Sequence, residues 1–124
     1  MTDLDVTIPE PVEGPTVPED AKIITLARSA LARTGAEQGA CVRDTDGRTY
    51  AGAAVDLPHL RLSAVAVAVA MAVSSSAPGL EAVAVAGTAG PSEDDLAIVG
   101  DLPGTDVAVW HVDPRGTVQS KIIT

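Results

Sequence analysis

The sequence has almost no aromatic residues: one Tyr, one Trp and no Phe, or 2% of 124 residues. Hydrophobic residues still make up 46% of the chain, so Ala, Val, Leu and Ile must fill the core. Side chains this small let neighbouring layers of structure approach closely. The length and composition predict one compact domain.

Cysteine is also nearly absent. The single Cys41 excludes an internal disulfide and cannot make a multi-thiolate metal site alone. It lies between Ala40 and Val42 in a strand-like pattern, and no basic neighbour in the sequence is placed to lower its pKa. We therefore interpret it as a small buried hydrophobe rather than a nucleophile.

Positive charge is scarce, with 8 Lys and Arg against 17 Asp and Glu and a net charge of −9. The bases are scattered, which disfavours nucleic-acid binding. The longest apolar run, 62–73, contains Ser63 and is shorter than a membrane span. No basic segment followed by an apolar one opens the chain. We expect a cytoplasmic protein with no membrane or nucleic-acid partner.

Residues 1–19 contain four prolines and five acids but no Lys or Arg. This composition resists helix formation and buries little surface, so we predict a flexible acidic Pro-rich arm followed by one domain over 20–124. Val6-Thr7-Ile8 within the arm has strand character and can add to a sheet edge or contact a neighbouring subunit.

The sequence pattern over 20–124 predicts an α/β fold with the element order α-β-β-α-β-α-β-β. We expect a mixed sheet with helices on both of its faces. An apolar stripe and a capping Gly35 indicate the first helix, and Asp46-Gly47 indicates a hairpin turn. In 60–73 the alternation of Ala and Val resembles a strand. The length of the segment and its many alanines favour a buried helix, which is our assignment. The predicted elements are helix 20–34, hairpin 39–55, helix 60–73, strand 81–86, helix 92–99, strand 106–112 and edge strand 117–123.

The segment 39–56, the helix after it, and the strand Glu81-Ala-Val-Ala-Val-Ala-Gly87 resemble a cytidine deaminase over about a hundred residues. In that family a hairpin leads into an Asn-Val-Glu-Asn segment, a helix begins Cys-Ala-Glu, and Pro-Cys-Gly-x-Cys opens a later helix. The resemblance implies a three-layer sandwich. It also implies a zinc ion that activates water and a Glu that transfers the proton to the leaving amine.

This chain departs from the family at every position that the chemistry needs. The resemblance places the first zinc ligand at Val65 and the catalytic Glu at Val67, and the other ligands at Ser92 and Asp95. Valine cannot ligate a metal, and a hydroxyl with one carboxylate poorly replaces two thiolates. We expect no zinc, no other cofactor and no catalytic residue, and only Pro91 remains of the later motif.

The ribose-holding segment has also lost its two Asn, which become Ala54 and Leu57, and keeps only an acid, Asp56. Asp56, His59 and Ser92 are the candidates for a residual ligand site, although a solvated loop is the favoured interpretation of His59.

Other polar groups have simpler explanations. Glu93-Asp94-Asp95 and the nearby Asp101 resemble a divalent-cation set, but acids at a helix start are ordinarily explained by capping and the helix dipole. Ser92 and Asp95 have the spacing of a capping box. His111 beside Trp110 on a strand is a candidate site residue, but a partly buried packing pair is the simpler interpretation.

Two functions follow. In the first, the protein is a catalytically inactive member of the superfamily that acts as an oligomeric scaffold, a dimer or tetramer, or binds a protein partner. In the second, it binds a small nucleoside-like ligand or performs a divergent deamination at a non-standard site built from Asp56, His59 and the Ser92 helix. An unrelated α/β module is the third reading, which the order of the strands can decide.

Overall fold

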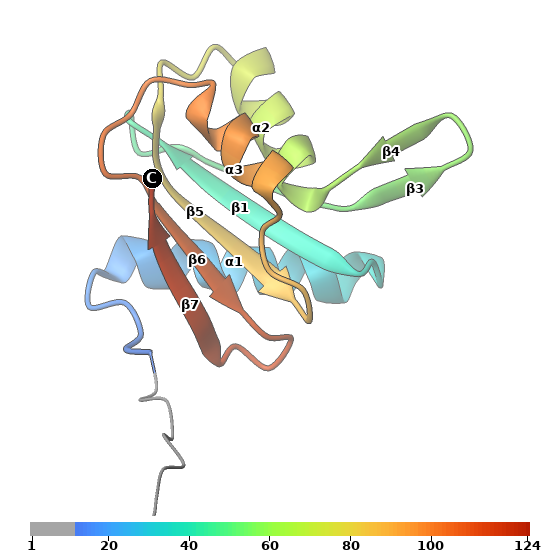
Figure 1. The fold of residues 1–124 in the computed structure, drawn as a ribbon, viewed down its shortest axis with the longest axis horizontal. Helices are drawn as coiled ribbons and strands as arrows, with labels where there is room; N and C mark the ends of the chain where they lie inside the picture. Colours follow the sequence, from blue (N-terminus) through green and yellow to red (C-terminus); the bar gives the residue numbers. More distant parts are fainter. Residues whose placement is uncertain (1–11) are drawn as a thin grey trace, which may run out of the picture.

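The computed structural model describes residues 12–124, and Val6-Thr7-Ile8 lies outside the described residues (Figure 1). Three helices and seven strands follow one another along the described chain. They are α1 (Pro18–Thr34), β1 (Gln38–Asp44), β2 (Thr49–Ala53), β3 (Val55–Leu57), β4 (Leu60–Leu62), α2 (Ala64–Ser74), β5 (Leu80–Gly87), α3 (Glu93–Gly100), β6 (Ala108–Val112) and β7 (Val118–Ile123).

The five-stranded sheet has the order β2-β1-β5-β6-β7. Only the β5–β6 pair is parallel, because α3 crosses over between these two strands, so the sheet is mixed. α1 covers one face of the sheet, and α2 and α3 cover the other (Figure 1). The predicted three-layer sandwich is confirmed, and β7 is an edge strand as predicted.

Alternation of Ala and Val on the central strand β5 divides the core into two. Val83 and Val85 face α2 and α3, whereas Ala82, Ala84 and Ala86 face α1. The alanine face brings α1 very close: a Cβ added at Gly39 would lie 2.2 Å from the Ala27 carbonyl oxygen. Because small side chains and not aromatic ones line this face of β5, α1 and the sheet lie in close contact.

The second predicted helix begins four residues too early. Residues 60–62 form β4, which pairs with β3 in a separate two-stranded hairpin, and the helix starts only at Ala64. Leu-Arg-Leu alternates as a strand requires, the turn at Pro58-His59 brings it against β3, and Ser63 then caps the helix. The predicted order therefore lacked two strands, because these short segments were absorbed into a hairpin and a helix.

The first helix begins at Pro18, two residues before the predicted start. Proline suits the first turn of a helix, where its missing N–H costs nothing. Gly35 caps the other end in the left-handed conformation with a φ of 65°, as its position predicted. No helix among residues 12–124 is long and apolar enough to span a bilayer.

Candidate functional site

Ser92 and Asp95 form a complete capping box at the start of α3. The Asp95 N–H donates to Ser92 Oγ over 3.1 Å, and the Ser92 N–H donates to Asp95 Oδ2 over 3.0 Å. These two bonds satisfy backbone donors that a helix start leaves free. The prediction that this acidic turn caps a helix is confirmed.

The second oxygen of Asp95 reaches across to α2. Ser63, the N-cap of α2, donates its hydroxyl hydrogen to Asp95 Oδ1 over 2.6 Å and accepts the Ala66 N–H over 3.1 Å. Asp95 is 3% exposed, so its carboxylate is buried between the N-termini of two helices. Both helix dipoles favour a negative charge at that point. We call Ser63, Asp95 and Ser92 the serine–aspartate bridge.

Val65 and Val67 take the positions of the first ligand and the catalytic Glu. Val65 is fully buried in the core between the sheet and α2, among residues that include Val85. Val67 lies against the backbone of β2, since a Cβ added at Gly52 would be 2.6 Å from Val67 Cγ1. Val65 therefore packs as apolar core, whereas Val67 is half-buried against β2, and neither side chain offers a metal ligand.

These residues do not fit the zinc ion that the family resemblance implies. Two of the four positions hold hydrocarbon side chains, and both Asp95 oxygens and Ser92 Oγ already have hydrogen-bond partners inside the bridge. Across residues 12–124, no three His, Cys, Asp or Glu side chains are arranged to hold a metal ion. No reaction step can be derived through a metal here.

Of the three candidate ligand residues, Asp56 and His59 lie apart from the bridge, and Ser92 is part of it. Asp56 is on β3, exposed, and pairs with Arg61 over 3.3 Å, while His59 is exposed in the turn of the same hairpin. Figure 1 shows this hairpin projecting away from the sheet and from α3. Ser92 is engaged in the capping box. The fold thus places two of the three candidates on one projecting element and the third at the start of α3.

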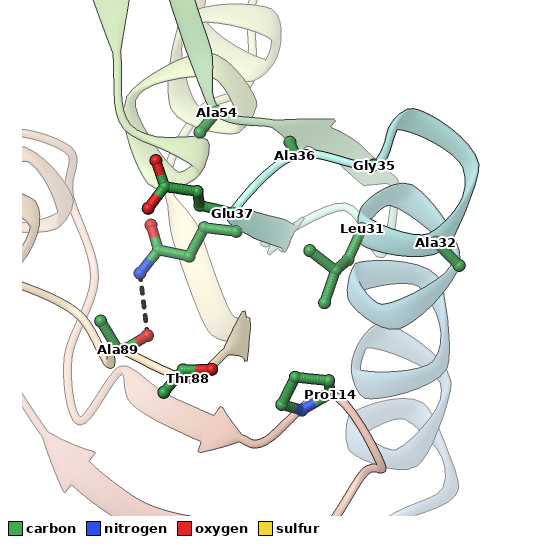
Figure 2. A pocket seen from close by; sticks show the side chains of 10 residues that line it. Leu31, Ala32, Gly35, Ala36, Glu37, Ala54, Thr88, Ala89 and Pro114 are labelled. Atoms are coloured by element: carbon green, nitrogen blue, oxygen red, sulfur yellow. Dashed lines mark hydrogen bonds between the residues drawn. The ribbon is translucent and has the colours of Figure 1, made fainter.

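A cavity opens at the end of the sheet where β5 stops and β1 begins (Figure 2). Its volume is about 950 Å³. Its walls are mostly apolar, and Gln38, one of the lining residues, donates from Nε2 to the Ala89 carbonyl over 3.0 Å. The lining residues are Leu31, Ala32, Gly35, Ala36, Glu37, Gln38, Ala54, Thr88, Ala89 and Pro114. Ala54 alone among them belongs to the segment that holds ribose in the family.

His111 supports the loop beside this cavity. Its Nε2 lies 2.8 Å from the Gly87 carbonyl oxygen, which only accepts, so Nε2 carries the proton. The ring also lies against Gly90, where an added Cβ would be 2.9 Å from Nδ1. His111 is 8% exposed and Trp110 is 3% exposed, so both are buried. The prediction that they pack as a pair is wrong, because Trp110 pairs with Ala84 and His111 with Val85, which face opposite sides of the sheet.

Sequence reasoning missed a buried ion pair beneath α1. Arg43 Nη1 lies 2.9 Å from Asp20 Oδ1, and the Trp110 indole N–H donates to Asp20 Oδ2 over 3.3 Å. From the sequence we place Asp20 at the start of the first helix and assign it no buried partner. An Arg within the strand pattern of β1 was the only signal that a buried partner was needed.

Comparisons with known proteins agree with this geometry. A family model described as cytidine deaminase-like matches residues 16–116. Cytidine deaminase from Burkholderia pseudomallei superposes with a TM-score of 0.70 at 21% identity, covering 84% of this chain and 90% of that one. The enzyme from Mycobacterium tuberculosis gives 0.63 at 22% identity, covering 72% and 81%. The enzyme from Mycobacterium leprae gives 0.63 at 19%, covering 80% and 90%. No curated protein matches significantly.

Proposed function

Since the chain belongs to the cytidine deaminase-like family, we propose that it keeps the family fold without the family chemistry and acts as a cytoplasmic scaffold by associating with copies of itself. One observation carries the loss of chemistry. Val65 packs as core, Val67 lies half-buried against β2, and Asp95 is already bonded to Ser63 and Ser92, where the reaction needs two thiolates, a further ligand and a free Glu.

Self-association is supported by an uncharged surface. α2 has no charged residue over its whole length, yet Met71 is 41% exposed and Val73 is 54% exposed on its outer side. Copies that each carry a net charge of −9 repel one another, so they meet most favourably where neither presents a charge. A second copy of this chain is therefore the occupant that we assign to the outer face of α2.

The projecting hairpin extends the apolar surface near the start of α2. Leu57 is 55% exposed and Leu60 is 48% exposed, and the hairpin contacts the rest of the described chain mainly through α2. A two-stranded hairpin is marginally stable by itself. Contact with a second copy would stabilise it and cover both leucines.

Two measurements test the two parts of this proposal. Mass-spectrometric metal analysis of freshly purified protein, beside a cytidine deamination assay with and without added zinc, should find neither metal nor turnover. Near-stoichiometric zinc with turnover would refute the loss of chemistry. Analytical ultracentrifugation should find a dimer or tetramer, and a monomer at all concentrations would refute self-association.

A matched pair of variants locates the interface. Val73→Glu on α2 should shift the protein toward monomer, whereas Ile123→Glu on β7, at an equally exposed residue, should leave the oligomer intact. Both residues are 54% exposed, so the substitutions differ in location and not in burial. Dissociation by Ile123→Glu alone would move the interface to the β7 edge.

The cavity of Figure 2 favours the alternative function, binding of a small nucleoside-like molecule. Its volume of about 950 Å³ accommodates such a ligand, and Ala54 contributes to its wall. Calorimetric titration with cytidine and uridine tests this. Saturable binding that Thr88→Trp abolishes would support the alternative, and indifference to both nucleosides would exclude it.

A further inference from the structure

We propose that the serine–aspartate bridge replaces the zinc ion as the connection between the first turns of α2 and α3, so that the fold is stable without metal. In the family pattern the ligands come from the starts of two helices, and the ion therefore joins those helices. In this chain the Ser63 hydroxyl and the Asp95 carboxylate join the same two helix starts.

The chemistry of the bridge is complete without any added group. Ser63 donates to one carboxylate oxygen of Asp95, and the Ser92 N–H donates to the other. Ser63 Oγ also accepts the Ala66 N–H, and Ser92 Oγ accepts the Asp95 N–H. Each bond to the carboxylate is charge-assisted, and Asp95 is 3% exposed, which strengthens such bonds further.

Val65 and Val67 remove the other polar groups that a lost zinc ion would leave without a partner. A half-buried Glu with no metal or partner would carry a desolvation cost, and Val67, which is half-buried against β2, carries none. Val65 stands where the family has its first zinc ligand, and its side chain is 0% exposed and packs in the hydrophobic core. Losing the ion thus leaves one buried charge at this place, and that charge has partners on both helices.

The inference depends on the metal-free site of the proposed function but not on self-association. Thermal unfolding of the full chain with and without a strong chelator gives the first test. The Tm should not change, and a Tm lowered by several degrees would show that a metal still supports the fold. Metal analysis decides separately whether any ion is bound.

Variants then test whether Asp95 joins the helices. Asp95→Ala should lower the Tm by about 5–10 °C, because it leaves part-buried donors at the starts of both helices without an acceptor. Asp94→Ala is the matched control, since Asp94 is an exposed acid in the same turn of α3, and it should change the Tm by no more than about 2 °C. Equal losses in the two variants would overturn the proposal.

The decisive readout is on the other helix. If the bridge joins the helices, Asp95→Ala should speed hydrogen exchange of the Ala66 amide in α2 about tenfold, because Ser63 loses the group that orients its hydroxyl. Ser92→Ala breaks the capping box within α3 but keeps the Ser63–Asp95 bond, so it should leave that amide protected. Unchanged exchange in Asp95→Ala would mean that Asp95 only caps α3.

A double-mutant cycle provides a second measure. Ser63→Ala and Asp95→Ala should each lower the Tm, and the double variant should lose clearly less than the two losses added together. Additive losses would show that the residues stabilise their own helices independently, and the proposal would fail even in a protein free of metal.

Discussion

At Gly52 the backbone of β2 lies directly against the Val67 side chain, with 2.6 Å from an added Cβ to Val67 Cγ1. Gly52→Ala should therefore destabilise the protein by about 1–3 kcal/mol through overpacking. In a Val67→Ala background, which removes the nearest atom, the same substitution should cost no more than about half as much. Urea unfolding of the four proteins measures both costs.

Gly100 at the end of α3 provides the control for this prediction. An added Cβ there meets no atom within 4 Å, so Gly100→Ala should be neutral or slightly stabilising. An equal cost for Gly52→Ala with and without Val67 would place the strain elsewhere on β2.

Cys41 makes the free energy of unfolding depend on pH in the alkaline range. Burial raises the pKa of its thiol from 9.0 to about 11, and Cys41 is 0% exposed. Between these values the unfolded chain loses the thiol proton while the folded chain keeps it. The stabilisation from this thiol is therefore complete below pH 9 and falls as the pH rises toward 11.

Cys41→Ala should remove this contribution to the pH dependence. The free energy of unfolding of the variant should fall less steeply than that of the parent between pH 9 and 11. Burial also raises the pKa of Tyr50, helped by its bond to Asp44, but Tyr50 is present in both proteins and cancels in the comparison. Urea titrations at several pH values provide the profiles, and parallel profiles would contradict the prediction.

At the scale of elements, the Asp20–Arg43 pair fixes α1 to the sheet. The two side chains are 13% and 9% exposed, and Glu81, the other partner of Arg43, is 50% exposed. Asp20→Ala should cost about 3–5 kcal/mol, because it leaves a buried guanidinium with only a solvated partner. Glu81→Ala should cost no more than about 1 kcal/mol. Chemical denaturation compares them, and similar costs would mean that Arg43 is effectively solvated.

The sequence predicted the elements whose signals are local. The capping Gly35, the Asp46-Gly47 turn and the Ser92–Asp95 spacing each determine a backbone geometry within a few residues, and all three appear as expected. The hairpin of β3 and β4 was missed because strands of three residues leave no period to detect. Its pairing depends on a turn that the apolar pattern of the following helix obscured.

Contacts between residues that are far apart in the chain could not be predicted from the sequence pattern. Ser63 and Asp95 are 32 positions apart, and Asp20 and Trp110 are 90 apart. Family positions marked Asp95 as a lost ligand, but only the fold shows that its carboxylate has gained a partner on α2. The cavity was missed for the same reason, because its wall gathers residues from the ends of four separate segments.

At the scale of the whole molecule, net charge opposes the association that we propose. Copies carrying −9 each repel one another, while α2 offers an interface with no charged residue of its own. Added salt screens the repulsion, since the Debye length falls from about 10 Å at 0.1 M to about 3 Å at 1 M. An apolar interface is not weakened by that screening, so association should become tighter as salt rises.

Sedimentation velocity at about 0.05 and 0.5 M sodium chloride tests this directly, and the Kd for self-association should fall several-fold over that range. The same titration with Val73→Glu should show much weaker association at both concentrations, because its two added carboxylates would face each other across the interface of a symmetric dimer. If salt instead weakened association of the parent protein, ion pairs would hold the copies together. The interface would then have to lie on a charged surface and not on α2.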